Sequence, residues 1–220
     1  MATLADIQRL VGVTADGVLG PATINALWSA LQGDNRTMQN PTAFYAGVRS
    51  ITGPLDQTQV NTIEALLSAA SHWSVAWLAY GLATAWHEAR MKPIEEIGKG
   101  KGRPYGAPGK YGQAQYGRGL VQLTWDRNYE RADKELGLGG ALLKDFGLAL
   151  TPKIATEILV RGMAEGWFTG KALRDYLPSP LGTPPQFTEA RRIINGTDRA
   201  PAIAEHARRF QDALVLGGWG

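Results

Sequence analysis

The stretch that most constrains the fold runs from residue 75 to residue 88, where the chain has helical periodicity but no polar face. One side of this helix is apolar and is formed by Val75, Leu78, Ala79, Leu82 and Trp86. The other side carries Trp77, Tyr80 and Thr84, and no charged side chain precedes His87. A helix that is apolar almost all round is stable only when other elements surround it, and this one is too short to cross a bilayer. The sequence therefore predicts a mainly α fold built around one buried central helix.

Signals for further helices continue along the rest of the chain. Thr151 and Pro152 form a cap and a first-turn proline, which predicts a helix through about Phe168. Gly137 predicts the end of a helix that starts near Asp126. The other predicted helices cover residues 4–10, 22–31, 173–177, 188–194 and 198–216. Residues 120–124 alternate like a short strand.

The composition narrows the class of protein. At 220 residues the chain fits one domain with a small appendage. It has no cysteine, which excludes disulfides and thiolate chemistry and indicates folding in a reducing compartment. The N-terminal residues lack the basic and apolar segments of a secretory signal. The net charge of +3 suits an anionic polymer as partner, whether nucleic acid, membrane surface or cell wall.

The N-terminal segment is predicted to be a separate helical unit, with residues 1–33 in the unit, 34–42 in a linker and 43–220 in the main domain. Its motifs are Ile7-Gln8-x-Leu10, Asp16-Gly17-x-x-Gly20-Pro21-x-Thr23 and Ala26-Leu27. In these motifs it resembles a shortened form of the helical peptidoglycan-binding module of wall hydrolases. The resemblance implies a wall-binding role for Asp16, Gly17, Gly20 and Thr23. The alternative is a helical hairpin that only packs against the main domain, because about thirty residues bury little core alone.

A carboxylate ends the buried helix. Glu88 follows His87 at the C-terminal end of the helix, where apolar surroundings and the negative end of the helix dipole both favour the protonated carboxyl. A protonated carboxyl is what a general acid needs near neutral pH. The alternative is a glutamate that faces water or pairs with Arg90.

Two more carboxylates, Glu95 and Glu96, follow Pro93 and Ile94. Two carboxylates on opposite walls of a cleft are the minimum set for glycosidic hydrolysis. The next segment, residues 98–119, holds eight glycines, five basic residues and three tyrosines, and no acidic residue. We expect this loop to close over a polymeric or anionic substrate, and the alternative is a flexible solvated loop. Its glycine spacing does not fit a phosphate-binding loop.

Three blocks of sequence together carry a second resemblance. They are Trp86-His87-Glu88, then Tyr116-Gly117-Arg118-Gly119-Leu120-Val121-Gln122-Leu123-Thr124-Trp125 with Asn128-Tyr129, and finally Arg192-Ile193-Ile194-Asn195-Gly196. In order and spacing they resemble the family 19 chitinases and their phage endolysin relatives in the lysozyme-like superfamily. The resemblance covers about residues 70 to 215. It implies a lysozyme-like catalytic domain.

The resemblance also implies a role for individual residues. Glu88 matches the catalytic acid, Glu96 the base that activates water, and Thr124 the hydroxyl that helps to hold that water. Because the interval between the carboxylates is short, Glu95 could replace Glu96. The residues matched to the sugar cleft are Gln122, Asn128 and Asn195. A family arginine on the last helix falls at His206 in this chain.

Further side chains near these motifs are predicted to contact the substrate. The aromatic rings of Tyr80, Tyr116 and Trp125 could stack on sugar faces, although such rings more often lie in a core. Arg118 is predicted to bind substrate as well. In the family the reaction inverts the anomeric centre, which requires carboxylates roughly 6.5–9.5 Å apart.

Other chemistries find little support. The three histidines are scattered, so we predict no metal site, and neither a serine-hydrolase motif nor a cofactor fingerprint occurs. We therefore expect a monomeric endolysin that hydrolyses the β-1,4 bonds of bacterial peptidoglycan without a cofactor, nucleic acid or stable membrane insertion. It would be made in the host cytoplasm and reach the wall through a membrane lesion formed by another protein. The alternatives are a chitinase acting on chitin oligomers and a non-catalytic wall-binding or nucleic-acid-binding protein.

Overall fold

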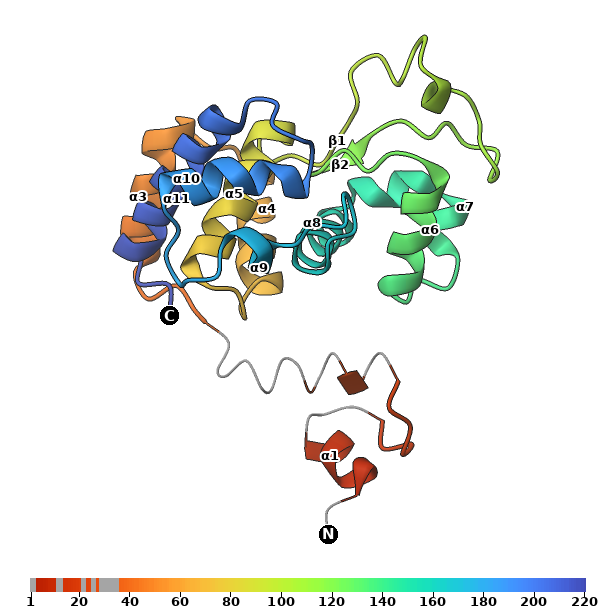
Figure 1. Cartoon of the computed structure of the whole chain (residues 1–220), viewed down its shortest axis with the longest axis horizontal. Helices are drawn as coiled ribbons and strands as arrows, with labels where there is room; N and C mark the ends of the chain where they lie inside the picture. The colour runs from red at the N-terminus through yellow and green to blue at the C-terminus, as the bar shows by residue number, and fades with distance from the viewer. Residues whose placement is uncertain (1–2, 11–13, 21–22, 25–26, 28–35) are drawn as a thin grey trace.

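The computed structural model describes residues 3–10, 14–20, 23–24, 27 and 36–220. The fold is mainly α, as predicted, with one two-stranded sheet in the described part of the chain (Figure 1). Of the two helices predicted before residue 33, the first is α1, Leu4–Leu10. The second, predicted for residues 22–31, lies largely outside the described residues. Within those residues, no helix is long and apolar enough to cross a membrane.

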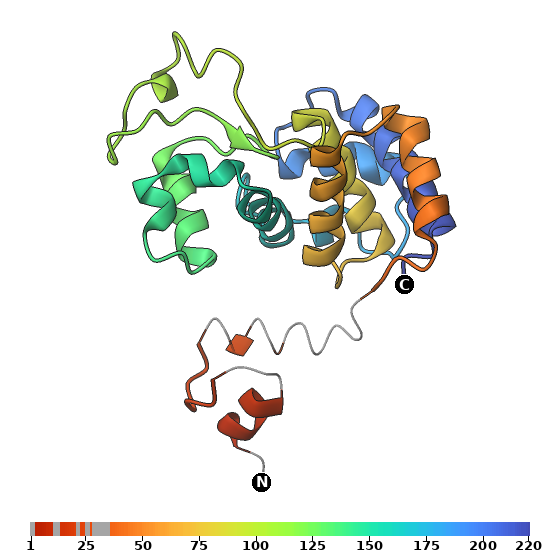
Figure 2. The same ribbon diagram turned by 180° about the vertical axis from the view of Figure 1, so that it is seen from behind.

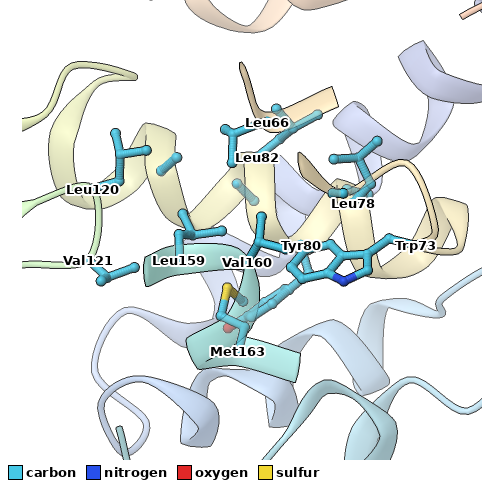
Figure 3. Close-up of a cluster of buried hydrophobic side chains, with 14 of the residues drawn as sticks. Leu66, Trp73, Leu78, Tyr80, Leu82, Leu120, Val121, Leu159, Val160 and Met163 are labelled. Atoms are coloured by element: carbon cyan, nitrogen blue, oxygen red, sulfur yellow. The ribbon is translucent and has the colours of Figure 1, made fainter. Parts of the chain in front are cut away.

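The predicted central helix is α5, Val75–Ala89. Ser74 caps its N-terminus by accepting a hydrogen bond from the Trp77 backbone N–H, and Arg90 ends it in the left-handed conformation, with φ 51°. Ten of its fifteen residues are buried. Figure 3 shows Tyr80 and Leu82 of this helix in one buried cluster with Leu159 and Met163. The prediction of a buried central helix is confirmed.

The other helices form two groups. The larger group surrounds α5, and α11 packs along α5 and also contacts α3 and α10. Its members are α3 (Pro41–Thr52), α4 (Gln57–Ala69), α9 (Leu173–Tyr176), α10 (Pro184–Glu189), the 3-10 helix η3 (Ala190–Ile193) and α11 (Ala200–Leu216). The smaller group contains α6 (Asp126–Glu135), α7 (Ala141–Lys144) and η2 (Phe146–Leu150). Helix α8, Pro152–Glu165, lies between the two groups and contacts both α4 and η2 (Figure 2).

Most predicted helix boundaries are close to the observed ones. The helix predicted from residue 151 ends at Glu165 rather than Phe168, because Gly166 takes the left-handed conformation, with φ 73°. The helix predicted for residues 188–194 is wrong in type and start. An α-helix begins earlier, with the paired prolines at 184 and 185 as its first residues, and continues as a tighter 3-10 turn from Ala190.

The sheet lies next to the predicted strand rather than on it. Strand β1, Ile94–Glu95, pairs antiparallel with β2, Arg118–Gly119. Residues 120–124, predicted as a strand, instead form a turn, in which Leu123 folds back and exchanges two backbone hydrogen bonds with Arg118. Gln122 takes a left-handed conformation to allow this reversal, with φ 54°. The alternating apolar pattern of residues 120–124 therefore reflects the burial of a turn and not a pleated strand.

Residues just before α3 are joined to the C-terminal end of the chain. The Thr37 backbone N–H donates to the Gly220 carbonyl at 2.9 Å, and Asn40 N–H donates to the Gly217 carbonyl at 2.8 Å. Arg36 donates to the carbonyl of Trp73 at 3.0 Å. Residues 36–42 of the predicted linker are therefore held by the main helical unit.

Candidate active site

Glu88 lies in the last turn of α5 and forms an ion pair with Arg191. The Arg191 Nη1 atom lies 2.6 Å from Glu88 Oε1. The arginine side chain is 2% exposed and the glutamate 19%. The Arg191 Nε–H also donates to the Asp198 carbonyl at 3.0 Å, which fixes the guanidinium. A buried, hydrogen-bonded guanidinium holds a carboxylate in a single orientation. The sequence predicted apolar surroundings for Glu88, but the structure also places a buried cation beside it.

The partner of Glu88 is not Arg90, the arginine considered from the sequence. Arg90 ends α5 and stacks over the Trp86 ring, 4.8 Å from its centroid. His206, where a family arginine was expected, lies on α11. The arginine comes instead from η3, 103 residues after Glu88. The one feature of the sequence that marks Arg191 is its position directly before the Arg192–Gly196 motif.

Glu96 follows β1 and is held by the hairpin. Its backbone N–H donates to the Gly117 carbonyl at 2.8 Å, and the Gly117 N–H donates back to Glu96 Oε2 at 3.1 Å. The Tyr105 hydroxyl donates to the other carboxylate oxygen at 3.1 Å. A Cβ on Gly117 would lie 2.9 Å from Gln122 Oε1 and 3.0 Å from Gln122 Cβ, so a larger residue here would have to displace the Gln122 side chain. Tyr105, which was not among the predicted site residues, thus orients Glu96.

Glu95 has a different set of partners. The Lys99 Nζ lies 2.7 Å from Glu95 Oε2, and the Tyr116 hydroxyl donates to Oε1. The hydrogen bond from Lys99, followed by that from Tyr116, holds the pKa of the Glu95 carboxyl below its usual range. Both oxygens of Glu95 are therefore engaged by the protein.

Tyr116 and Arg118, both predicted to bind substrate, lie beneath the surface. Arg118 Nη1 donates to the carbonyls of Ala114 and Tyr116 and to the Tyr129 hydroxyl. Its guanidinium carbon lies 3.7 Å from the centre of the Tyr116 ring. These contacts hold the Arg118 guanidinium beneath the surface, behind Glu95. It therefore has no exposed face with which to contact a sugar.

The turn after β2 and the start of α6 carry three predicted site residues and link them to the hairpin. The Thr124 hydroxyl donates to the Gln122 carbonyl at 2.8 Å, and the Asn128 amide donates to the Thr124 carbonyl at 2.6 Å. The Gln122 amide donates to the Ile94 carbonyl of β1 at 3.2 Å. The structure therefore brings Gln122, Thr124 and Asn128 together beside the strand that leads to Glu96.

The remaining predicted residues differ in their exposure. Trp125 is 37% exposed and makes an edge contact with the Tyr105 ring, with centroids 5.5 Å apart. Asn195 is exposed at the end of η3, where its N–H donates to the Arg191 carbonyl at 3.0 Å. Tyr80 was expected to stack on a sugar, and this is wrong. It is fully buried against Phe187, with ring centroids 6.2 Å apart.

The glycine-rich loop is attached to the smaller helix group. The Gln113 side chain donates to the Leu143 carbonyl and accepts from the Phe146 N–H. Earlier in the loop, Lys110 and Tyr111 both hydrogen-bond to the Glu130 side chain of α6. These contacts attach residues 110–113 to the smaller helix group, which argues against the alternative of a flexible solvated loop. Next to it lies an open hollow of about 380 Å³, lined by Gln115, Trp125, Asp126 and Arg127.

In the N-terminal segment, Gln8 is the organising residue. Its fully buried amide donates to Asp16 Oδ1 at 2.7 Å, to the Val18 carbonyl at 2.9 Å and to Thr23 Oγ1 at 2.8 Å. Its carbonyl accepts from the Gly17 N–H at 2.8 Å. Three of the predicted wall-module residues are therefore joined through one side chain. The fourth, Gly20, donates its N–H to the Val18 carbonyl at 2.8 Å.

Comparisons with known proteins agree with the resemblance to chitinases. No family model matches the chain. Endochitinase CHI of Arabidopsis thaliana is 30% identical over 105 residues, which are 48% of this chain and 35% of that protein. A second endochitinase of the same plant is 32% identical over 128 residues, 54% of this chain and 40% of that protein. The matches thus span less than half of the length of these relatives.

A solved structure shows the same fold. The crystal structure of a mutant of chitinase C superposes with a TM-score of 0.55 and 19% identity, over 86% of this chain and 97% of that one. The predicted resemblance to chitinases and the mainly α, lysozyme-like fold class are confirmed.

Two histidines lie close to the candidate acid. His87 precedes Glu88 on α5, and His206 lies on α11, the helix that packs along α5. Burial lowers the pKa of both imidazoles below the usual value, and it does the same for His72. The His206 Nδ1 atom is buried and has no hydrogen-bond partner among the described residues. The fold therefore favours neutral histidines.

We predict that this preference makes the protein less stable in mild acid. The folded histidines have lower pKa values than the unfolded ones, which titrate near 6.5. As pH falls through 6.5, the unfolded chain binds protons that the folded chain resists, so the free energy of unfolding decreases. Urea denaturation at pH 7.5 and pH 5.5 measures this difference, and His206→Gln should make it smaller. Equal or greater stability of the wild-type protein at pH 5.5 would contradict the assignment.

Proposed function

We propose that this chain is a glycoside hydrolase that cleaves β-1,4 bonds between amino sugars, and that its substrate is bacterial peptidoglycan. The observation that carries the proposal is the carboxylate pair. Glu88 is oriented by Arg191 at the end of a buried helix, and Glu96 is oriented by Tyr105 and Gly117 on the hairpin that follows. The similarity of sequence and fold to chitinases supports this chemistry.

The proposed reaction is a single displacement with inversion. Protonated Glu88 gives its proton to the leaving glycosidic oxygen as the bond between that oxygen and the anomeric carbon breaks. Glu96 takes a proton from a water molecule, whose oxygen forms the new bond to the anomeric carbon from the opposite face. Thr124 lies on the turn beside the hairpin and helps to hold that water. Glu95 is the less suitable base, because the hydrogen bonds from Lys99 and Tyr116 hold the pKa of its carboxyl below the usual range, which weakens it as a base.

Peptidoglycan is proposed as the substrate on the basis of the N-terminal segment. The Gln8 hydrogen bonds give that segment an ordered loop with the motif of a wall-binding module. Val18, Leu19 and Ile24 are exposed on it, which leaves apolar surface for a partner. The second candidate is chitin, because the relatives with similar sequence are endochitinases. A non-catalytic wall-binding protein is the least favoured, since it would not need two oriented carboxylates.

Glu88→Gln removes the transferable proton and keeps the size of the side chain. We expect its activity to fall roughly a thousandfold, within the range of a general-acid contribution. The measurement is the release of new reducing ends from purified peptidoglycan and from chitin oligomers, with the products identified by mass spectrometry. Glu189→Gln is the control, because Glu189 is an exposed carboxylate paired with Arg192 near the same segment. If the Glu88→Gln variant kept a tenth of wild-type activity, Glu88 would be excluded as the acid.

The choice between Glu96 and Glu95 gives a matched pair of variants. We expect Glu96→Ala to be nearly inactive and Glu95→Ala to be impaired at least tenfold less. Azide should restore turnover to Glu96→Ala and yield a glycosyl azide of inverted configuration, because an inverting enzyme forms no covalent intermediate. Equal losses in the two variants, or a larger loss at Glu95, would transfer the role of base to Glu95.

Deletion of residues 1–33 tests the wall-binding role of the N-terminal segment. We expect weaker retention on insoluble wall sacs, with little change in the hydrolysis of soluble glycan fragments. Gln8→Leu should reproduce the loss in the full-length chain, because it removes the hydrogen bonds that join Asp16, Gly17 and Thr23. If the truncated protein binds sacs as well as the intact one, the segment only packs against the main domain.

A further inference from the structure

The hollow beside Trp125 lies next to the candidate active site. Gln115 of the loop and the first residues of α6 form its walls. The Tyr105 ring contacts Trp125, and the Tyr105 hydroxyl donates to Glu96, so one side chain joins the hollow to the proposed base. A volume of about 380 Å³ is in the range of small-molecule sites. The hollow therefore has the size and the place to receive a branch of a substrate bound at Glu96.

Trp125 is held so that its ring forms a wall of this hollow. Its backbone is in the left-handed region, with φ 74°, which is unfavourable for a bulky residue. Two backbone hydrogen bonds keep it there, from Trp125 N–H to the Gln115 carbonyl and from Asn128 N–H to the Trp125 carbonyl. The conformation leaves a large apolar ring 37% exposed beside a polar wall. A functional constraint explains such strain better than stability does.

The Arg127 guanidinium at the hollow is not tied to the protein. It is exposed and has no hydrogen bond or ion pair with any described residue. Asp126 lines the same hollow and keeps its negative charge, but it is not paired with Arg127: its Oδ2 accepts the Lys110 backbone N–H, and its Oδ1 is buried with no hydrogen-bond partner among the described residues. Two lysines of the nearby loop, by contrast, are paired, Lys99 with Glu95 and Lys110 with Glu130. A cation in the first turn of a helix is also disfavoured by the helix dipole, so Arg127 does not serve the fold.

Gln115 adds a hydrogen-bond donor of fixed position. Its Oε1 atom accepts from the Asp126 N–H at 3.0 Å, which orients the amide. The Nε2 group is then left to donate. A guanidinium, an amide donor and an aromatic wall together suit a carboxylate attached to a less polar chain.

We propose that this hollow binds a carboxylate of the stem peptide that branches from peptidoglycan, with Arg127 as the residue that recognises it. The inference rests on the proposed function and deepens it. Chitin has no carboxylate and no branch, so Arg127 contributes to the choice between the two polymers. The lactyl group that links sugar to peptide becomes a second possible carboxylate once the peptide is removed.

The test compares three soluble ligands: peptide-bearing glycan strands, strands stripped of peptide by an amidase, and chitin oligomers. Binding is measured by calorimetry in the Glu88→Gln background, so that the outcome does not depend on turnover. We expect Arg127→Gln to weaken binding of the peptide-bearing strands at least tenfold and to change the other two less than twofold. Arg127→Lys should recover part of the loss. Lys134→Gln, which removes an exposed charge from the same helix, is the control.

Several outcomes would overturn the proposal. No change with any ligand would show that Arg127 is only solvated, and equal losses with all three would show that it acts on the sugar backbone or the fold. A loss confined to the stripped strands would assign Arg127 to the lactyl carboxylate, which is free only there, rather than to the peptide. Failure of the proposed function is a separate result, in which peptide-bearing strands bind but the wild-type enzyme cleaves none of the three ligands.

Discussion

The ion pair between Glu88 and Arg191 is the contact on which the rest of the site depends. It joins two segments that are far apart in sequence, and the arginine is almost fully buried. A buried guanidinium without its carboxylate would cost about 3–5 kcal/mol. The helices that carry the two groups must therefore keep their relative position. Helix α11 fixes that position, because it packs along α5 and also contacts η3, which carries Arg191.

The second carboxylate is presented in a different way. A sheet of two residues per strand is too small to be stable alone. The hairpin is kept in place by side chains on both sides of it, with Tyr105 bonded to Glu96, Gln122 bonded to β1, and Arg118 buried behind Glu95. The proposed acid thus belongs to the helical core, and the proposed base belongs to a loop that side chains hold in place. Because the two carboxylates are supported separately, a change in the loop can alter the distance between them without a change in the helical core.

The sequence predicted those parts of the molecule that local rules determine. Helix α5 has apolar periodicity and a capping serine, and helix α6 is followed by a glycine. These signals act over a few residues, and the boundaries of both helices are close to the predicted ones. The role of Arg191 could not be predicted, because nothing local decides which of two adjacent arginines turns inward. The same is true of Tyr80, whose burial depends on Phe187 of a distant helix. The turn at residues 120–124 looked like a strand because burial on a tight turn and burial on a pleated sheet leave similar patterns.

The hydrogen bonds between residues 37–40 and residues 217–220 have a consequence for how a protein with this fold can be varied. They bring the first and last parts of the helical unit to one edge of the molecule. Neither segment contains a residue of the candidate site. A module fused at either end would leave from the same edge, so targeting units can be exchanged, moved from one end to the other or added in tandem without altering the active site. The architecture is thus suited to recombination, both in evolution and in the design of chimeric proteins.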